Sequence, residues 1–104
     1  MKEEVLYRPD DRNQLYYYVN PYTDDEKMIQ FTLRNQEEHD LLDVEIFVNN
    51  RKPFYVGTIK PGEIFESFPV PYGPYRKKND YTICWENPDG SHWEVFATFD
   101  KIHR

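Results

Sequence analysis

Residues 41–70 decide the fold, and their sequence is LLDVEIFVNNRKPFYVGTIKPGEIFESFPV. Apolar and polar residues alternate in three runs of this stretch, and a cluster of turn-forming residues separates each run from the next. Because successive side chains of a β-strand point to opposite faces, each run predicts a strand with one buried face and one mostly solvated face. The buried face of the first strand is predicted to contain Leu42, Val44, Ile46 and Val48.

The two turns in this stretch carry different signals. Residues 49–53, Asn-Asn-Arg-Lys-Pro, are of types that tolerate a tight backbone. In residues 60–63, Lys-Pro-Gly-Glu, proline suits the second position of a type II turn, and glycine accepts the positive φ of the third. The alternation predicts that Phe54, Val56 and Thr58 share one face of the second strand, and that Ile64, Glu66, Phe68 and Val70 share one face of the third.

Four further strands are predicted outside this stretch, over residues 15–19, 28–34, 81–86 and 92–99. Their composition is rich in aromatic and β-branched residues, which fit a pleated, half-buried surface. The side chains predicted to share the apolar face of each strand are Leu15, Tyr17, Val19, Ile29, Phe31, Leu33, Tyr81, Ile83, Trp85, Trp93, Val95, Ala97 and Phe99.

Loops are predicted between these strands from proline, glycine and charged residues. Residues 69–80 begin with three prolines in six positions, and proline removes a hydrogen-bond donor from a sheet, so an extended loop is expected there. Residues 87–90, Asn-Pro-Asp-Gly, predict a hairpin turn. Seven short strands separated by turns are typical of an antiparallel β-sandwich, so the predicted fold class is all-β.

The length of 104 residues predicts a single sandwich domain over residues 1–104, with residues 1–14 as a loose start or a short edge strand. Within it, the sequence VEIFVNN…VGTIKPGE resembles the immunoglobulin-like β-sandwich domains of bacterial accessory and surface proteins. In those domains a strand ending in Asn is followed by a short edge strand and a turn of the pattern G-x-I/L-x-P-G-E. The resemblance implies an immunoglobulin-like sandwich and brings no catalytic residues with it.

Composition and charge narrow the classes of partner. The net charge is −6, and residues 1–40 carry ten acidic and five basic groups, so the acidity belongs to the front of the chain. A negative domain repels phosphate backbones, so no nucleic-acid partner is expected. No apolar run is long enough to span a membrane, and the charged start lacks the pattern of a signal peptide, so a cytoplasmic protein without a membrane partner is predicted. A secreted protein whose leader had been removed would look the same.

Residues that could carry chemistry show no specific spacing. His39, His92 and His103 are not paired at ligand spacing with one another or with Cys84, so neither a metal nor another cofactor is predicted. The lone cysteine excludes an internal disulfide framework and is expected to be a buried, inert thiol. Ser67 and Ser91 stand in no nucleophile motif, so a non-enzymatic protein is predicted.

Aromatic residues make up 17% of the chain, and several fall on faces that the alternation predicts to be solvated. An exposed apolar patch on a small soluble domain usually marks a partner surface, and Tyr and Phe are enriched in such patches. The alternative is that loops, above all residues 71–75, cover these rings. The candidate partner-binding residues are Tyr16, Tyr18, Phe47, Phe65, Tyr72, Tyr75 and Phe96.

Three functions compete on this evidence. The first is a non-catalytic module that binds another protein, or a second copy of itself, through outward-facing aromatics or a sheet edge. The second is a carbohydrate-binding sandwich, in which Trp85, Trp93 or the tyrosines form a flat platform. The third is a small acidic inhibitor of a basic partner, which predicts one negative face built from Asp10, Asp11, Asp24, Asp25 and Glu26.

Overall fold

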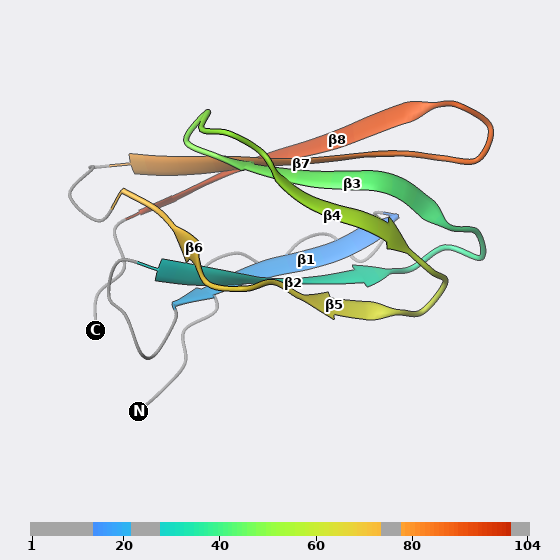
Figure 1. Cartoon of the computed structure of the whole chain (residues 1–104), viewed down its shortest axis with the longest axis horizontal. Helices are drawn as coiled ribbons and strands as arrows, with labels where there is room; N and C mark the ends of the chain where they lie inside the picture. The colour runs from blue at the N-terminus through green and yellow to red at the C-terminus, as the bar shows by residue number, and fades with distance from the viewer. Residues whose placement is uncertain (1–13, 22–27, 74–77, 101–104) are drawn as a thin grey trace.

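The computed structural model of the chain describes residues 14–21, 28–73 and 78–100. These residues form eight antiparallel strands in two sheets that pack face to face (Figure 1). The strands are β1 Leu15–Pro21, β2 Met28–Asn35, β3 Leu41–Val48, β4 Phe54–Ile59, β5 Ile64–Glu66, β6 Val70–Pro71, β7 Lys78–Glu86 and β8 His92–Asp100. The prediction of an all-β antiparallel sandwich is therefore confirmed. None of the described residues belongs to a helix long and apolar enough to cross a membrane.

Each sheet contains strands from both halves of the described chain. In the first sheet, β2 lies between β1 and the two short strands β5 and β6, which pair with different parts of β2. In the second sheet the strand order is β4-β3-β7-β8. The third strand of the opening stretch is therefore not paired with the two before it, because the chain crosses between the sheets after β4.

The core lies between the inner faces of the two sheets. Tyr81 of β7 packs edge-on against two rings of the first sheet, with ring centroids 5.1 Å from Phe31 and 6.1 Å from Tyr17. Such edge-to-face pairs add to the burial of apolar area. The predicted alternation is confirmed for β1, β2 and β7, whose buried side chains are Leu15, Tyr17, Val19, Ile29, Phe31, Leu33, Tyr81, Ile83 and Trp85.

The predicted turns form, and their hydrogen bonds identify them. Asn49 and Asn50 both have positive φ, and Arg51 N donates to Val48 O at 3.1 Å, so a turn of the I′ kind begins the link between β3 and β4. Gly62 has φ of +75° within the 60–63 turn, where Glu63 N donates to Lys60 O at 2.9 Å. Gly90 closes the last hairpin with a bond from its N–H to Asn87 O.

A bulge in β3 changes which leucine enters the core. The three steps along β3 from Leu41 to Val44 oppose only two steps of β4, from Ile59 to Gly57, and Asp43 has a left-handed φ of +49°. Leu41 is consequently fully buried and Leu42 is only half-buried, so the prediction that Leu42 faces the core was wrong. A period of two cannot continue through an inserted residue.

A second bulge, next to Gly57 in β4, shifts the alternation there. Phe54 and Val56 pack against the core as predicted, but Ile59 is buried and Thr58 is exposed, which reverses the prediction for the end of the strand. Gly57 has a φ of +95°, which side-chain-bearing residues rarely adopt. The strand therefore changes face at the one residue that tolerates this backbone.

In β5 the observed faces are the reverse of the predicted ones. Phe65 packs against the core, whereas Ile64 and Phe68 are 59% and 73% exposed. Val70, predicted to share their face, is buried, because the chain leaves the sheet between β5 and β6 and re-enters it in a different register. The outward apolar residues of this edge are therefore Ile64 and Phe68, and Phe65 is not one of them.

Candidate functional site

The outer face of the first sheet brings two of the predicted aromatics together. Tyr16 lies opposite Arg34, which lies opposite Ile64, and the next row is Tyr18, Thr32 and Glu66. We call these six residues the tyrosine face. They line a depression of about 470 Å³ together with Gln36. Tyr16 and Tyr18 pack edge-on with ring centroids 5.9 Å apart, and both rings are partly exposed.

Charge on the tyrosine face is of both signs. Arg34 and Glu66 are exposed, and they lie one row apart on the paired strands β2 and β5. Arg34 stands between an aromatic and an aliphatic residue in its row. Tyr and Arg are the residue types that most often dominate the binding energy of protein interfaces, so this face has suitable chemistry for a protein contact.

Phe68 extends the apolar part of this side of the sandwich, and Ser67 fixes its orientation. The Ser67 side chain is buried, and its hydroxyl accepts a hydrogen bond from Phe31 N at 2.9 Å and donates one to Phe68 O at 2.8 Å. Ser67 N also donates to Phe31 O at 2.9 Å. Ser67 therefore points inward, whereas the next residue, Phe68, is exposed.

The outer face of the second sheet holds two other predicted aromatics. Phe47 and Phe96 lie on either side of Thr82 in one row across β3, β7 and β8. Phe96 is 64% exposed and Phe47 is partly exposed. Two strand spacings, about 10 Å, separate Phe47 from Phe96, so the two rings lie on either side of Thr82 and do not form one continuous aromatic patch.

The remaining aromatic candidates do not form part of a described outer face. Tyr72 is 4% exposed and belongs to the core, so its prediction as a contact residue was wrong. Phe65 packs against the core, as described above. Tyr75 lies outside the described residues. The five carboxylates proposed to form an acidic inhibitory face, at positions 10, 11, 24, 25 and 26, also lie outside them.

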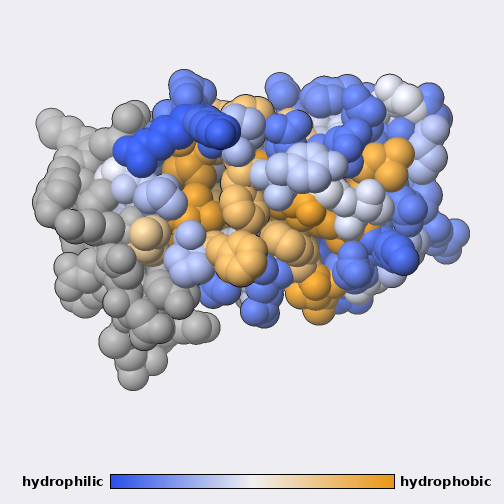
Figure 2. All heavy atoms as spheres, in the orientation of Figure 1, coloured by the Kyte–Doolittle hydropathy of each residue, from blue (hydrophilic) through white to orange (hydrophobic). Residues whose placement is uncertain are grey.

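The sheet edges β4 and β5–β6 lie on the same side of the sandwich, and Figure 2 shows hydrophobic atoms along the gap between them. A groove of about 160 Å³ lies there, lined by Ile46, Val48, Arg51, Lys52, Phe54, Val70 and Pro71. Native edges are commonly protected by proline and by bulges. Here proline occurs at positions 53, 69 and 71, and a bulge lies beside Gly57, so neither edge offers a long run for strand addition. Compared with these two edges, the outer faces are the better candidates.

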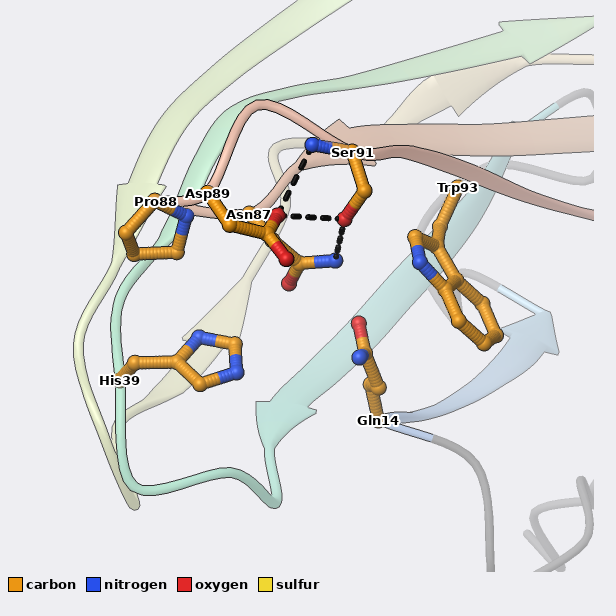
Figure 3. Close-up of a pocket in the computed structure, with 7 residues that line it drawn as sticks. All are labelled: Gln14, His39, Asn87, Pro88, Asp89, Ser91 and Trp93. Atoms are coloured by element: carbon orange, nitrogen blue, oxygen red, sulfur yellow. Dashed lines mark hydrogen bonds between the residues drawn. The ribbon is translucent and has the colours of Figure 1, made fainter.

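A separate pocket of about 340 Å³ lies at the end of the sandwich formed by the last hairpin (Figure 3). Its lining residues come from three parts of the chain that are distant in sequence: Gln14, His39, Asn87, Pro88, Asp89, Ser91 and Trp93. Trp85 is buried beneath it and donates its indole N–H to Gln14 Oε1 at 2.9 Å. Trp93, predicted to face the core, is 48% exposed and is the second residue of β8, next to the last hairpin.

Hydrogen bonds order the hairpin side of this pocket. Asp89 Oδ1 accepts bonds from the hydroxyl and the main-chain N–H of Ser91, at 2.7 and 2.9 Å, and Asn87 Nδ2 donates to Ser91 Oγ at 3.0 Å. The Ser91 side-chain bond, followed by its main-chain bond, holds the pKa of Asp89 below its ordinary value. The nearby His39 lowers this pKa further. The Ser91 hydroxyl thus donates to the carboxylate of Asp89. The ring Nδ1 of His39 lies 3.1 Å from a different group, the main-chain oxygen of Asp40.

Sequence reasoning found this hairpin but missed the pocket. Asn87 and Asp89 were predicted to form a turn, which they do, but nothing in the spacing links them to Gln14 or His39. In the described part of the chain, no group of three or more His, Cys, Asp and Glu residues could hold a metal ion. Cys84 lies on the outer face of the second sheet between Glu45 and Glu94, and partial burial, with those two carboxylates, raises the pKa of its thiol.

Comparison with known proteins gives no assignment. No protein-family model matches the chain, and no curated protein matches it significantly in sequence. A solved structure, the X-ray structure of the Northeast Structural Genomics Consortium target SoR45, is similar at 13% sequence identity and a TM-score of 0.36. The similarity covers 95% of this chain and 82% of that one.

Proposed function

We propose that this chain is a non-catalytic, self-associating module of the immunoglobulin-like β-sandwich class, and that the tyrosine face is its contact surface. The observation that carries the proposal is the pattern of this face, which combines partly exposed tyrosines with an arginine and a glutamate on paired strands. The occupant that fits this pattern is a second copy of the same chain.

The strand order supports the immunoglobulin-like assignment. If β5 and β6 are counted as one interrupted strand, one sheet contains the first, second and fifth strands, and the other contains the fourth, third, sixth and seventh. Immunoglobulin-like domains pair strands A, B and E in one sheet, and C, F and G, with C′ in some members, in the other. Tyr81, buried near the start of β7, occupies the region of strand F where such domains often have a tyrosine.

The charges of the tyrosine face favour a symmetric contact. In a two-fold interface the same patch is used on both copies, so if residue i of one copy contacts residue j of the other, j also contacts i. Arg34 and Glu66 lie one row apart. A two-fold axis between them places Arg34 of each copy against Glu66 of the other, which makes two attractive pairs at once. Opposite charges that match in this way specify the partner and the register more than they add affinity.

The apolar residues supply the association energy in this proposal. The rings of Tyr16 and Tyr18 and the side chain of Ile64 surround the charged pair, and Phe68 lies in the link that follows β5. Burial of apolar area contributes about 25 cal/mol per Å², and aromatic anchors usually dominate the outcome. Both copies carry a net charge of −6, so long-range repulsion opposes association and only a matched local contact can offset it.

The experiment is sedimentation equilibrium of the full chain over protein concentrations from micromolar to millimolar. The expected result is a reversible monomer–dimer equilibrium. Ile64→Lys should weaken the dimer at least tenfold, because it places a charge in the apolar part of the contact. Phe96→Lys is the matched control, since Phe96 is similarly exposed, at 64% against 59% for Ile64, but lies on the outer face of the other sheet.

Two outcomes would contradict the proposal. One is a wild-type chain that sediments as a monomer throughout the concentration range. The other is a dimer that Phe96→Lys disrupts and Ile64→Lys leaves intact, which would move the contact to the second sheet. Circular dichroism of both variants checks that the fold is retained, as expected for substitutions at exposed positions.

A further inference from the structure

We infer that the pocket at the hairpin end of the sandwich, between Trp93, Asn87 and Gln14, binds a neutral saccharide. This site is separate from the tyrosine face, which lies on the outer surface of the first sheet. The inference therefore goes beyond the proposed self-association and does not depend on it.

An unpartnered oxygen of a buried side chain points into this pocket. Asn87 is 5% exposed, and its Nδ2 donates to Ser91 Oγ, but its Oδ1 is buried without a hydrogen-bond partner. In Figure 3 this oxygen is turned toward the space between His39 and Gln14. Buried polar atoms of native proteins are nearly always hydrogen-bonded, and an unsatisfied one costs roughly 1–3 kcal/mol. A ligand that donates a hydrogen bond here would satisfy it.

The other polar groups of the pocket complete a set suited to hydroxyl groups. Asp89 is an exposed carboxylate that Ser91 holds in place through Oδ1, so it is a fixed acceptor. Gln14 Oε1 already accepts the indole N–H of Trp85, which leaves the Gln14 NH₂ group as a donor. A sugar hydroxyl both donates and accepts, so adjacent hydroxyls can meet acceptors and a donor together.

Trp93 supplies the apolar wall. Its indole is half exposed, and Figure 3 shows it on the opposite side of the pocket from His39. A flat, partly exposed indole beside fixed polar groups suits a sugar ring, which has an apolar C–H face and a polar rim. The volume of about 340 Å³ lies within the range of pockets that hold small ligands. The carboxylate of Asp89 and the net charge of −6 disfavour an anionic ligand, so a neutral sugar is expected.

Nuclear magnetic resonance titration of the ¹⁵N-labelled chain tests this inference. The probes are glucose, galactose, mannose, N-acetylglucosamine, cellobiose and maltose, each raised to about 50 mM, which covers millimolar dissociation constants. At least one probe should shift the Trp93 indole and Asn87 side-chain amide signals saturably. The Trp85 indole N–H should shift as well, because it bonds to Gln14.

Variants separate binding at this pocket from binding elsewhere. Trp93→Ala should weaken binding of the active sugar at least tenfold, and Trp93→Phe should restore part of it, because a smaller flat ring remains. Phe96→Ala, at a more exposed aromatic three residues along the same strand, should bind like the parent. Trp93 is half exposed, so its replacement is expected to leave the fold intact.

Three results would overturn the inference: no saturable shift with any of the six sugars, shifts that persist unchanged in Trp93→Ala, or shifts of the Asn87 and Asp89 signals by calcium chloride alone. The last would assign the oxygens of the hairpin to a cation. Ile64→Lys, which is designed to break self-association, should leave sugar binding unchanged, so failure of either proposal can be recognised on its own.

Discussion

The hydroxyl of Ser67 accepts a hydrogen bond from the main-chain N–H of Phe31 at 2.9 Å, in place of a partner from a neighbouring strand. Ser67 lies in the link between β5 and β6, where the chain leaves β2 for three residues. The Ser67 side chain therefore supplies the hydrogen-bond acceptor that Phe31 N–H would otherwise lack at this break in the sheet. Its hydroxyl also donates to Phe68 O, which helps to hold the Phe68 main chain in place.

Ser67→Ala should lower the free energy of unfolding by about 1–3 kcal/mol, because it leaves the buried N–H of Phe31 without its side-chain partner. Urea denaturation followed by tryptophan fluorescence measures the change. Thr58→Ala, which removes an exposed hydroxyl, is the control and should change the free energy by no more than about 0.5 kcal/mol. Equal effects of the two substitutions would show that the Ser67 hydroxyl has no special role.

The β3–β4 hairpin should respond to the backbone preference of its second turn residue. Asn50 is exposed with φ of +59°, so Asn50→Gly should be neutral or should stabilise the fold by up to about 1 kcal/mol. Asn50→Val should destabilise it by about 1–2 kcal/mol, because a β-branched residue is strained at positive φ. Thermal unfolding of both variants checks this, and a Val variant as stable as the Gly variant would refute the turn assignment.

The sequence predicted the class of fold and most of the core, because period-two alternation is direct evidence of strands. The predicted inward and outward faces of strand residues were wrong at three places, and the three errors have a common cause. Asp43, Gly57 and the Ser67–Pro69 link each interrupt the regular ladder, so the faces of Leu42, Ile59 and Phe65 came out reversed. Whether a residue is inserted in a ladder depends on the partner strand, which alternation within one strand does not reveal.

The candidate surfaces were predictable only in part. Tyr16, Tyr18 and Phe96 were identified because the alternation of β1 and β8 is regular. Arg34 and Glu66 could not be linked from sequence, since β2 and β5 are adjacent only through a crossover between the sheets. The prediction of Tyr72 as a contact residue was wrong because its proline-rich stretch predicted a loop, whereas this residue directly follows β6 and belongs to the core.

Cys84 should react slowly with thiol reagents at neutral pH. Partial burial, then the charges of Glu45 and Glu94, raise its pKa, so the reactive thiolate is scarce. Glu45→Gln combined with Glu94→Gln should lower the pKa and speed reaction with iodoacetamide by roughly twofold to fivefold. Glu86→Gln, on the same strand as Cys84, is the control and should leave the rate unchanged. If none of these substitutions changes the reaction rate, the two carboxylates do not raise the Cys84 pKa and burial is its sole cause.

The pKa of Asp89 should depend on Ser91. The side-chain bond from Ser91 is the largest cause of the lowered pKa, so Ser91→Ala should raise it toward the ordinary value. A lowered pKa in the folded state stabilises the fold above the unfolded value of about 4, and that stabilisation is lost as the pH falls through the folded value. Ser91→Ala should therefore reduce the acid dependence of stability in this range. Titration of the Asp89 carboxyl, followed by carbon-13 nuclear magnetic resonance, measures the pKa. A pKa that is the same in Ser91→Ala as in the parent would contradict the role of the Ser91 hydrogen bond.

The most direct test of self-association through the tyrosine face is a charge exchange between Arg34 and Glu66. Arg34→Glu and Glu66→Arg should each weaken the homodimer at least tenfold, because each turns two attractive pairs into two repulsive ones, and the double variant should recover it. An equimolar mixture of the two single variants should form a heterodimer as tight as the parent dimer, since every pair is again opposite in sign. Sedimentation equilibrium of the separate variants and the mixture measures this. A mixture that sediments as the sum of its separate components would contradict the account.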